Sequence, residues 1–333
     1  MTAADVERTC EEAMKRCSAA VDQIVAIPAG ERTFANTMLA LETATDHVAQ
    51  AGGQYGFMAY VAEEEGLRET AREWEQRLDQ YGIELAFRED LYGAVKEFSN
   101  TDEVAKLTGQ PRRLVERALR DYRRIGFELA REERDLVRAL MNRLVELSTE
   151  FQKAIDTWED GIEADREELI GLPEAFISGL TKVESAGQQK YRVSLDYPEL
   201  HPFMSNAERG DLRRELYLKD MAKGGPGNVA RLEEAIQVRH QIADLLGYRS
   251  WAAYVMEERM AKEPRRAMEF LVDLEGRVRL KAQGDMGALK AARAAQDGGD
   301  SIDIWDWRFY TNRLLKTDYA IDEFEVAKYF PLE

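Results

Sequence analysis

Histidines, cysteines and carboxylates are the side chains of this chain that could bind a metal ion or attack a substrate. The sequence has 333 residues and only three histidines: His47, His201 and His240. A His-Glu-x-x-His sequence on one helix would place two imidazoles and a general base around a zinc ion, but no histidine is followed by glutamate. None has a carboxylate three residues before it, so the Glu-x-x-His pattern is missing too. We therefore assign no metal ligand.

Two of the histidines have neighbours that suggest a structural place. His240 and Asp244 lie one helical turn apart, but two ligands from a single turn do not make a metal site, so we expect an exposed or core-edge histidine. His201 stands beside Pro202 after a predicted strand, which indicates a structural loop residue.

The sequence also lacks the common motifs of a catalytic serine and of a phosphate-binding loop. Gly-x-Ser-x-Gly and Gly-x-x-x-x-Gly-Lys are both missing. Cys10 and Cys17 are seven residues apart on a predicted helix, so they share a face at about 10 Å, which is too far for a disulfide. Nothing in their acidic surroundings would lower a thiol pKa, and reduced thiols fit a cytoplasmic protein. We assign no catalytic residue, and the substrate-binding residues stay unknown.

Charged runs also have a simple interpretation. The acidic runs at residues 63–65 and 102–103 are typical of solvated faces. Arg112-Arg113 and Arg213-Arg214 sit among acids, so we expect no basic patch.

The composition restricts partners and location. The net charge of −17 and the pI near 4.9 argue against nucleic acid as a partner. They favour solubility, or else an acidic groove for basic peptides. No run of 18 apolar residues could cross a membrane, and the charged first 17 residues lack the apolar core of a signal peptide. We expect a cytoplasmic protein without a membrane partner.

Hydrophobic periodicity predicts a mainly α-helical chain. Helices are expected at residues 4–26, 54–64 and 67–98, the last with a bend near Gly82. A very long helix is expected at 129–162, because apolar residues recur every three or four positions from Leu136 to Ile162. Only residues 191–197 alternate with period two, which predicts a strand in a small hairpin or three-stranded sheet. We predict two regions: residues 1–165, all helical, and residues 166–333, helical with the β element.

Residues 205–261 show the clearest helix start and stop signals. Ser205 with Glu208 has the form of a capping box, and residues 224–226, Gly-Gly-Pro, end the helix that follows. Asn228 would cap a second helix, with an apolar face that includes Leu232 and Ile236, and Gly247 would end it. Ser250 would cap a third.

This stretch contains three distinctive segments: LRRELYL at 212–218, RHQIADLLGYRSWAAYV at 239–255 and ERMAKEP at 258–264. Together they resemble the thimet oligopeptidase, neurolysin and oligopeptidase A family of zinc metallopeptidases. Further words follow in the family's order: ERTFANTMLALE at 31–42, LIGLPEAFISGL at 169–180, YRVSLDYP at 191–198 and the segment 304–333. The resemblance covers nearly the whole chain.

The resemblance implies that this chain is the N-terminal half of such an enzyme, a multi-helical lobe of the neurolysin-like fold. The zinc ligands and the catalytic glutamate of the family would lie after residue 333, in a C-terminal catalytic half. The complete enzyme would bind zinc and hydrolyse short peptides, and this lobe would form one wall of its channel. The apolar last residues, 329–333, read as the middle of a longer protein. We expect this chain to bind no zinc and to be inactive alone.

Two alternatives stay open. The chain could be a stand-alone helical binding module that has lost its catalytic half, and it would then be monodisperse and fold cooperatively. It could also be an independent enzyme that uses a carboxylate cluster not visible in the sequence, which would require a bound metal or carboxyls with perturbed pKa.

Overall fold

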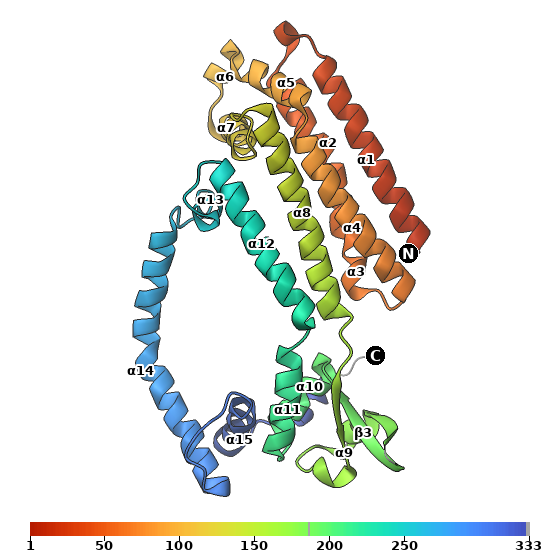
Figure 1. Cartoon of the computed structure of the whole chain (residues 1–333), viewed down its shortest axis with the longest axis vertical. Helices are drawn as coiled ribbons and strands as arrows, with labels where there is room; N and C mark the ends of the chain where they lie inside the picture. Colours follow the sequence, from red (N-terminus) through yellow and green to blue (C-terminus); the bar gives the residue numbers. More distant parts are fainter. Residues whose placement is uncertain (186, 331–333) are drawn as a thin grey trace. The chain divides into compact units, whose positions relative to one another are not determined.

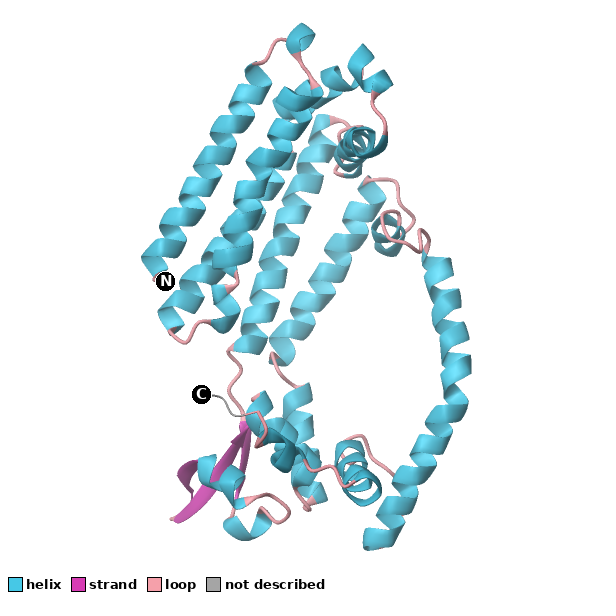
Figure 2. Cartoon of the chain, turned by 180° about the vertical axis from the view of Figure 1, so that it is seen from behind, coloured by secondary structure: helices cyan, strands magenta, loops and turns pink. Residues whose placement is uncertain are grey.

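A computed structural model describes residues 1–185 and 187–330 of the chain, and it confirms a mainly helical fold with a small three-stranded sheet (Figure 2). The chain divides into two compact units. Unit 1 comprises residues 1–153 and 228–263, and unit 2 comprises residues 154–227 and 264–333. Each unit is therefore built from two separate stretches of sequence. The boundary predicted at residue 165 stays a prediction.

Unit 1 is entirely helical in its described residues. Its elements are α1 (Ala3–Ala26), η1 (Ala29–Glu31), η2 (Phe34–Leu39), α2 (Ala40–Ala51), η3 (Gly52–Gly56), α3 (Met58–Val61), α4 (Glu65–Ala86), α5 (Glu89–Ser99), α6 (Asp102–Lys106), α7 (Gly109–Arg124), α8 (Arg131–Asp156), α12 (Gly225–Leu245) and α13 (Trp251–Met256). The helices α8 and α12 extend a few residues across the unit boundary.

The first helix shows how the sequence builds this unit. Thr2 and Asp5 form a capping box at its start, which satisfies backbone N–H groups of the first turn. Apolar residues then recur every three or four positions and are all buried: Val6, Cys10, Ala13, Cys17, Val21 and Ile24. This stripe packs on α2 and α4, which run beside α1 (Figure 1). Both cysteines are free, as predicted.

Unit 2 combines a sheet with helices. Its elements are β1 (Gly161–Ala164), η4 (Arg166–Glu168), α9 (Glu174–Gly179), β2 (Thr181–Ser185), β3 (Gln188–Ser194), α10 (Tyr197–Asn206), α11 (Gly210–Met221), α14 (Pro264–Asp297), α15 (Trp307–Tyr319) and α16 (Glu323–Ala327). The strands pair antiparallel in the order β1-β3-β2. Ile162, Val193 and Phe203 lie in a core between the sheet and α10–α11.

Several predicted boundaries were wrong. The helix expected at 129–162 ends at Asp156, and Ile162 is instead a buried residue of β1, where the alternation of four residues was too short to recognise. The chain breaks at Phe87 and Arg88 rather than at Gly82, which lies inside α4. Tyr197 begins α10 and is exposed rather than ending the strand.

Three of the five capping signals in residues 205–261 were right. Helix α11 ends at Met221, just before Gly224 and Gly225, whose φ values are positive. Ser250 does cap α13, and Gly247 follows the end of α12 with a φ of 74°. Ser205 and Asn206 instead form the end of α10, so the expected capping box does not exist. Asn228 lies buried in the first turn of α12, where its side-chain amide donates to the Phe151 carbonyl at 3.0 Å.

The buried face of α12 is formed by only some of the apolar residues expected there. Val238 and Ile242 are buried in unit 1, whereas Leu232 and Ile236 are about half exposed. The segment 329–333 was predicted to lie inside a longer protein, and its residues 331–333 lie outside the described residues. Within the described residues, no helix is both long and apolar enough to span a membrane.

Candidate functional site

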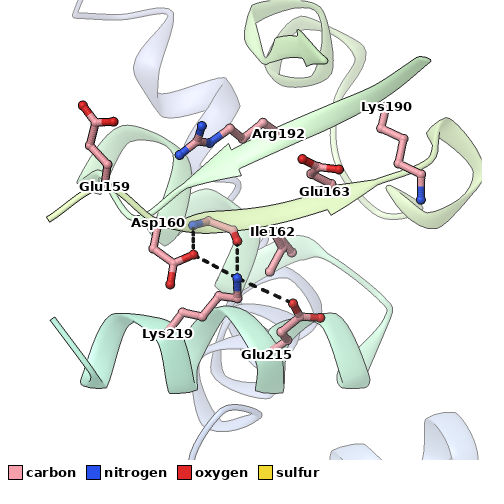
Figure 3. Close-up of a pocket in the computed structure, with 9 residues that line it drawn as sticks. Glu159, Asp160, Ile162, Glu163, Lys190, Arg192, Glu215 and Lys219 are labelled. Atoms are coloured by element: carbon pink, nitrogen blue, oxygen red, sulfur yellow. Dashed lines mark hydrogen bonds and ion pairs between the residues drawn. The ribbon is translucent and has the colours of Figure 1, made fainter. Parts of the chain in front are cut away.

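A polar pocket of about 510 Å³ lies in unit 2, between the sheet and α11 (Figure 3). Its lining is almost entirely charged: Glu159, Asp160, Gly161, Ile162, Glu163, Lys190, Arg192, Glu215 and Lys219. Strand β1 and the turn before it supply one wall, β3 the second and α11 the third. The strand was not predicted at this place, so the sequence offered no signal for the pocket.

Lys219 is the centre of the polar contacts in this pocket. Its ammonium group donates to Asp160 Oδ1 at 2.9 Å and to the Gly161 carbonyl at 2.7 Å, and it lies 3.9 Å from Glu215 (Figure 3). The hydrogen bond from Lys219, followed by the one from the Gly161 N–H, lowers the pKa of Asp160. Its contacts with Asp160, the Gly161 carbonyl and Glu215 make Lys219 an ion-pair anchor between α11 and the sheet rather than a free nucleophile.

Gly161 allows strand β1 to approach strand β3 closely at the wall of this pocket. It pairs with Ser194 in the ladder, and a Cβ atom added to it would lie 2.4 Å from the Val193 carbonyl oxygen. No other residue type fits such a backbone approach without a shift of the strand.

A second cavity in unit 2, of about 270 Å³, borders a buried charge network. Asp306 accepts from Arg213 at 2.5 Å and from Arg293 at 3.2 Å, and the side chains of Arg213 and Asp306 are almost completely buried. The network joins α11, the C-terminal part of α14 and the start of α15. Because Asp306 is the shared partner of both arginines, removing it would leave buried positive charge unpaired, so the cluster has a structural role in unit 2.

Unit 1 contains an apolar groove of about 670 Å³ between α2, α4, α5 and α7. Its lining includes Leu41, Leu85, Leu91, Leu114 and Ile125.

Two carboxylates with perturbed pKa also lie in unit 1, on α4. Burial raises the pKa of both Glu75 and Asp79, and the charge of Asp79 adds to the effect on Glu75. Tyr60 donates to Glu75 at 3.0 Å, which acts in the opposite direction. Neither carboxylate lines the pocket of Figure 3, and two acids one turn apart form no complete catalytic arrangement by themselves.

The three histidines lie on three different helices. His47 is exposed on α2, and His240 on α12 is exposed and lies 3.3 Å from Asp244. His201 is a residue of α10, not of a loop as predicted, because α10 continues through Pro202. Its ring lies 4.5 Å from that of Tyr197, and burial, then the nearby Arg308, lowers its pKa.

A zinc ion would need ligands that the described part of the chain does not bring together. Residues 1–185 and 187–330 contain no group of three or more histidine, cysteine, aspartate or glutamate side chains that could hold a metal ion. The residues present therefore do not fit the zinc site that the resemblance to a metallopeptidase family implies for the complete enzyme.

Comparison with known proteins gives a consistent result. The model of peptidase family M3 matches residues 203–333. Oligopeptidase A of Salmonella typhimurium is 28% identical over 96% of this chain and 49% of its own length. The thimet-like oligopeptidase of Dictyostelium discoideum is 28% identical over 99% of this chain and 50% of its own length. Saccharolysin of Saccharomyces cerevisiae is 28% identical over 84% of this chain and 41% of its own length. The chain thus spans about half the length of these relatives.

Proposed function

Because this chain belongs to peptidase family M3, we propose that it is the N-terminal lobe of a zinc-dependent oligopeptidase that hydrolyses short peptides. In this proposal the lobe forms one wall of the substrate channel, and the zinc ligands and catalytic residues belong to a C-terminal half. Support comes from the order of the resembling words along the chain and from its coverage of only half of each relative. The lobe is inactive alone, and its location is cytoplasmic, in keeping with two free buried cysteines.

The observation that carries this proposal is the surface of α14. This helix of 34 residues has no buried residue, although it contains large apolar side chains at Met268, Leu271, Leu274, Val278 and Met286. At 100° per residue these five side chains fall within about a third of the helix circumference, while the exposed Phe270, Val272 and Leu280 lie on its other sides. A continuous apolar stripe of this length is typical of a helix that packs against other protein. We assign the covering role to the half of the family protein that this chain does not span.

The test compares this chain with the extended reading frame. We would sequence the coding DNA past codon 333 and then assay both products on a fluorogenic short peptide, with and without a zinc chelator. We expect His-Glu-x-x-His in the extension, chelator-sensitive hydrolysis by the extended protein and none by this chain. Hydrolysis by this chain alone, or a stop codon after Glu333, would contradict the proposal.

A stand-alone interaction module is the second candidate function. The apolar groove of unit 1 is the feature that favours it, because such grooves bind amphipathic helices. A module of this kind must be monodisperse alone. The exposed apolar residues of α14, together with Tyr319, Tyr329 and Phe330, argue against it.

A further inference from the structure

Helix α7 carries a concentration of positive charge that contrasts with the acidity of the whole chain. Residues 112–124 contain six arginines and only two acids, in a chain with a net charge of −17. The arginines are Arg112, Arg113, Arg117, Arg120, Arg123 and Arg124. The helix spacing places several of them on the side of α7 that faces the segment after α13.

Most of these arginines are occupied by carboxylates. Arg112 donates to Glu116 at 2.8 Å, and Arg120 lies 2.6 Å from Glu258. Arg123 and Arg124 both donate to Glu257. Their charges are therefore neutralised within unit 1, where they fix the segment after α13 against α7.

Arg113 and Arg117 are different. Both are exposed, and neither side chain has a hydrogen bond or an ion pair with any residue that the structure describes. The sequence predicts no basic patch at Arg112-Arg113; Arg112 has Glu116 as its partner, whereas Arg113 has no partner among the described residues. The repeat of arginine at 113, 117 and 120 was the signal that could have revealed the patch.

These two arginines line a pocket of about 290 Å³ together with Arg120, Lys262, Glu116 and Glu258. All six lining side chains are charged. Both acids already have arginine partners, so the unused binding capacity of the pocket is cationic. Lys262 completes it from the segment after α13, with a φ of 64° that only a few residues other than glycine adopt. Among the residues that the structure describes, its ammonium contacts only a backbone carbonyl, that of Glu257 at 3.3 Å.

We propose that this pocket binds a small, multiply charged oxyanion, with Arg113, Arg117 and Lys262 as its ligands. Guanidinium groups match the oxygen pairs of phosphate and carboxylate in a planar, bidentate way. Arg113 and Arg117 lie one turn apart, at about 6 Å along the helix axis, so one compact dianion can reach both. The lining offers no apolar wall for a nucleoside or a hydrophobic side chain, and the acidity of the chain repels long polyanions.

Pyrophosphate and citrate are suitable probes, because they separate the phosphate source from the polycarboxylate source. We would titrate the full chain with each by calorimetry at fixed ionic strength, and with potassium chloride as the blank. We expect saturable binding of pyrophosphate or citrate at one site, weakened by about tenfold or more in the double variant Arg113→Gln/Arg117→Gln. Preference for one probe identifies the source of the oxyanion.

A matched control removes the same charge elsewhere. Arg277→Gln/Arg279→Gln changes two exposed arginines of α14 and is expected to bind like the wild-type chain. Circular dichroism melts of both double variants check that each stays folded. Equal weakening in both variants would mean general electrostatic attraction and would overturn the proposal. Lack of saturable binding of both probes at millimolar concentration would overturn it as well.

Discussion

At the scale of single residues, the sheet of unit 2 depends on one close backbone contact. Gly161→Ala would place a methyl group 2.4 Å from the Val193 carbonyl oxygen, so β1 must move away from β3. We expect the free energy of unfolding to fall by about 2 kcal/mol, the usual cost of overpacking. Urea unfolding followed by circular dichroism measures this.

Gly276→Ala is the control for that substitution. Gly276 lies within α14, and a Cβ atom there meets no heavy atom within 4 Å. Because alanine favours a helix more than glycine by about 1 kcal/mol, this variant should be unchanged or slightly stabilised. If both variants behaved alike, the contact between Gly161 and Val193 would not limit the sheet.

At the scale of elements, the segment after α13 is fixed to unit 1 through Glu257. Partial burial opposes ionisation of this carboxylate, but hydrogen bonds from Tyr248, Arg123 and Arg124 outweigh burial and lower its pKa from 4.5 to about 2. A lowered folded-state pKa stabilises the fold above about pH 4.5, and this contribution is lost as the pH falls towards 2. Its size is on the order of 2–3 kcal/mol.

Glu257→Gln tests this pH dependence. We expect the difference in unfolding free energy between wild type and variant to be largest at pH 7 and to shrink at pH 4 and again at pH 3, as measured by urea unfolding. Glu269→Gln, which removes an exposed carboxylate of α14, should differ from wild type by less than about 1 kcal/mol at each pH. A difference for Glu257→Gln that did not vary with pH would contradict the assignment.

The elements that could be predicted from sequence are those with a long, regular pattern. The apolar stripe from Val6 to Ile24 predicted α1, and the alternation around Val193 predicted β3. Strand β1 has only four residues and follows α8 after four residues, so its Ile162 continued the helical periodicity by coincidence. Asn228 was taken for a cap because its residue type is common there, whereas its amide is used to pair with Phe151 in the core.

The pockets could not be predicted for a different reason. Lys219 meets Asp160 across 59 positions of sequence, and Arg120 meets Glu258 across 138, so no local spacing reports them. A His-Glu-x-x-His motif, by contrast, can be sought in the sequence directly, because that test depends only on neighbouring residues.

At the scale of the whole molecule, the exposed stripe of α14 should control association of the chain with itself. Leu271 and Val278 are about half exposed and lie on one face of the helix. Without the half of the protein that we assign to cover it, this stripe should bring copies of the chain together at micromolar concentration, because the association removes apolar surface from water. Sedimentation velocity over a range of concentrations measures this.

The double variant Leu271→Glu/Val278→Glu should shift the chain towards monomer. Its urea unfolding should change by less than about 0.5 kcal/mol, because substitutions at exposed positions without special contacts are usually neutral. Gln283→Glu/Gln296→Glu adds the same two charges to α14 without removing apolar groups, and it should associate like the wild-type chain. A wild-type chain that is monodisperse throughout would instead favour the stand-alone module, since such a module must keep its own surface soluble.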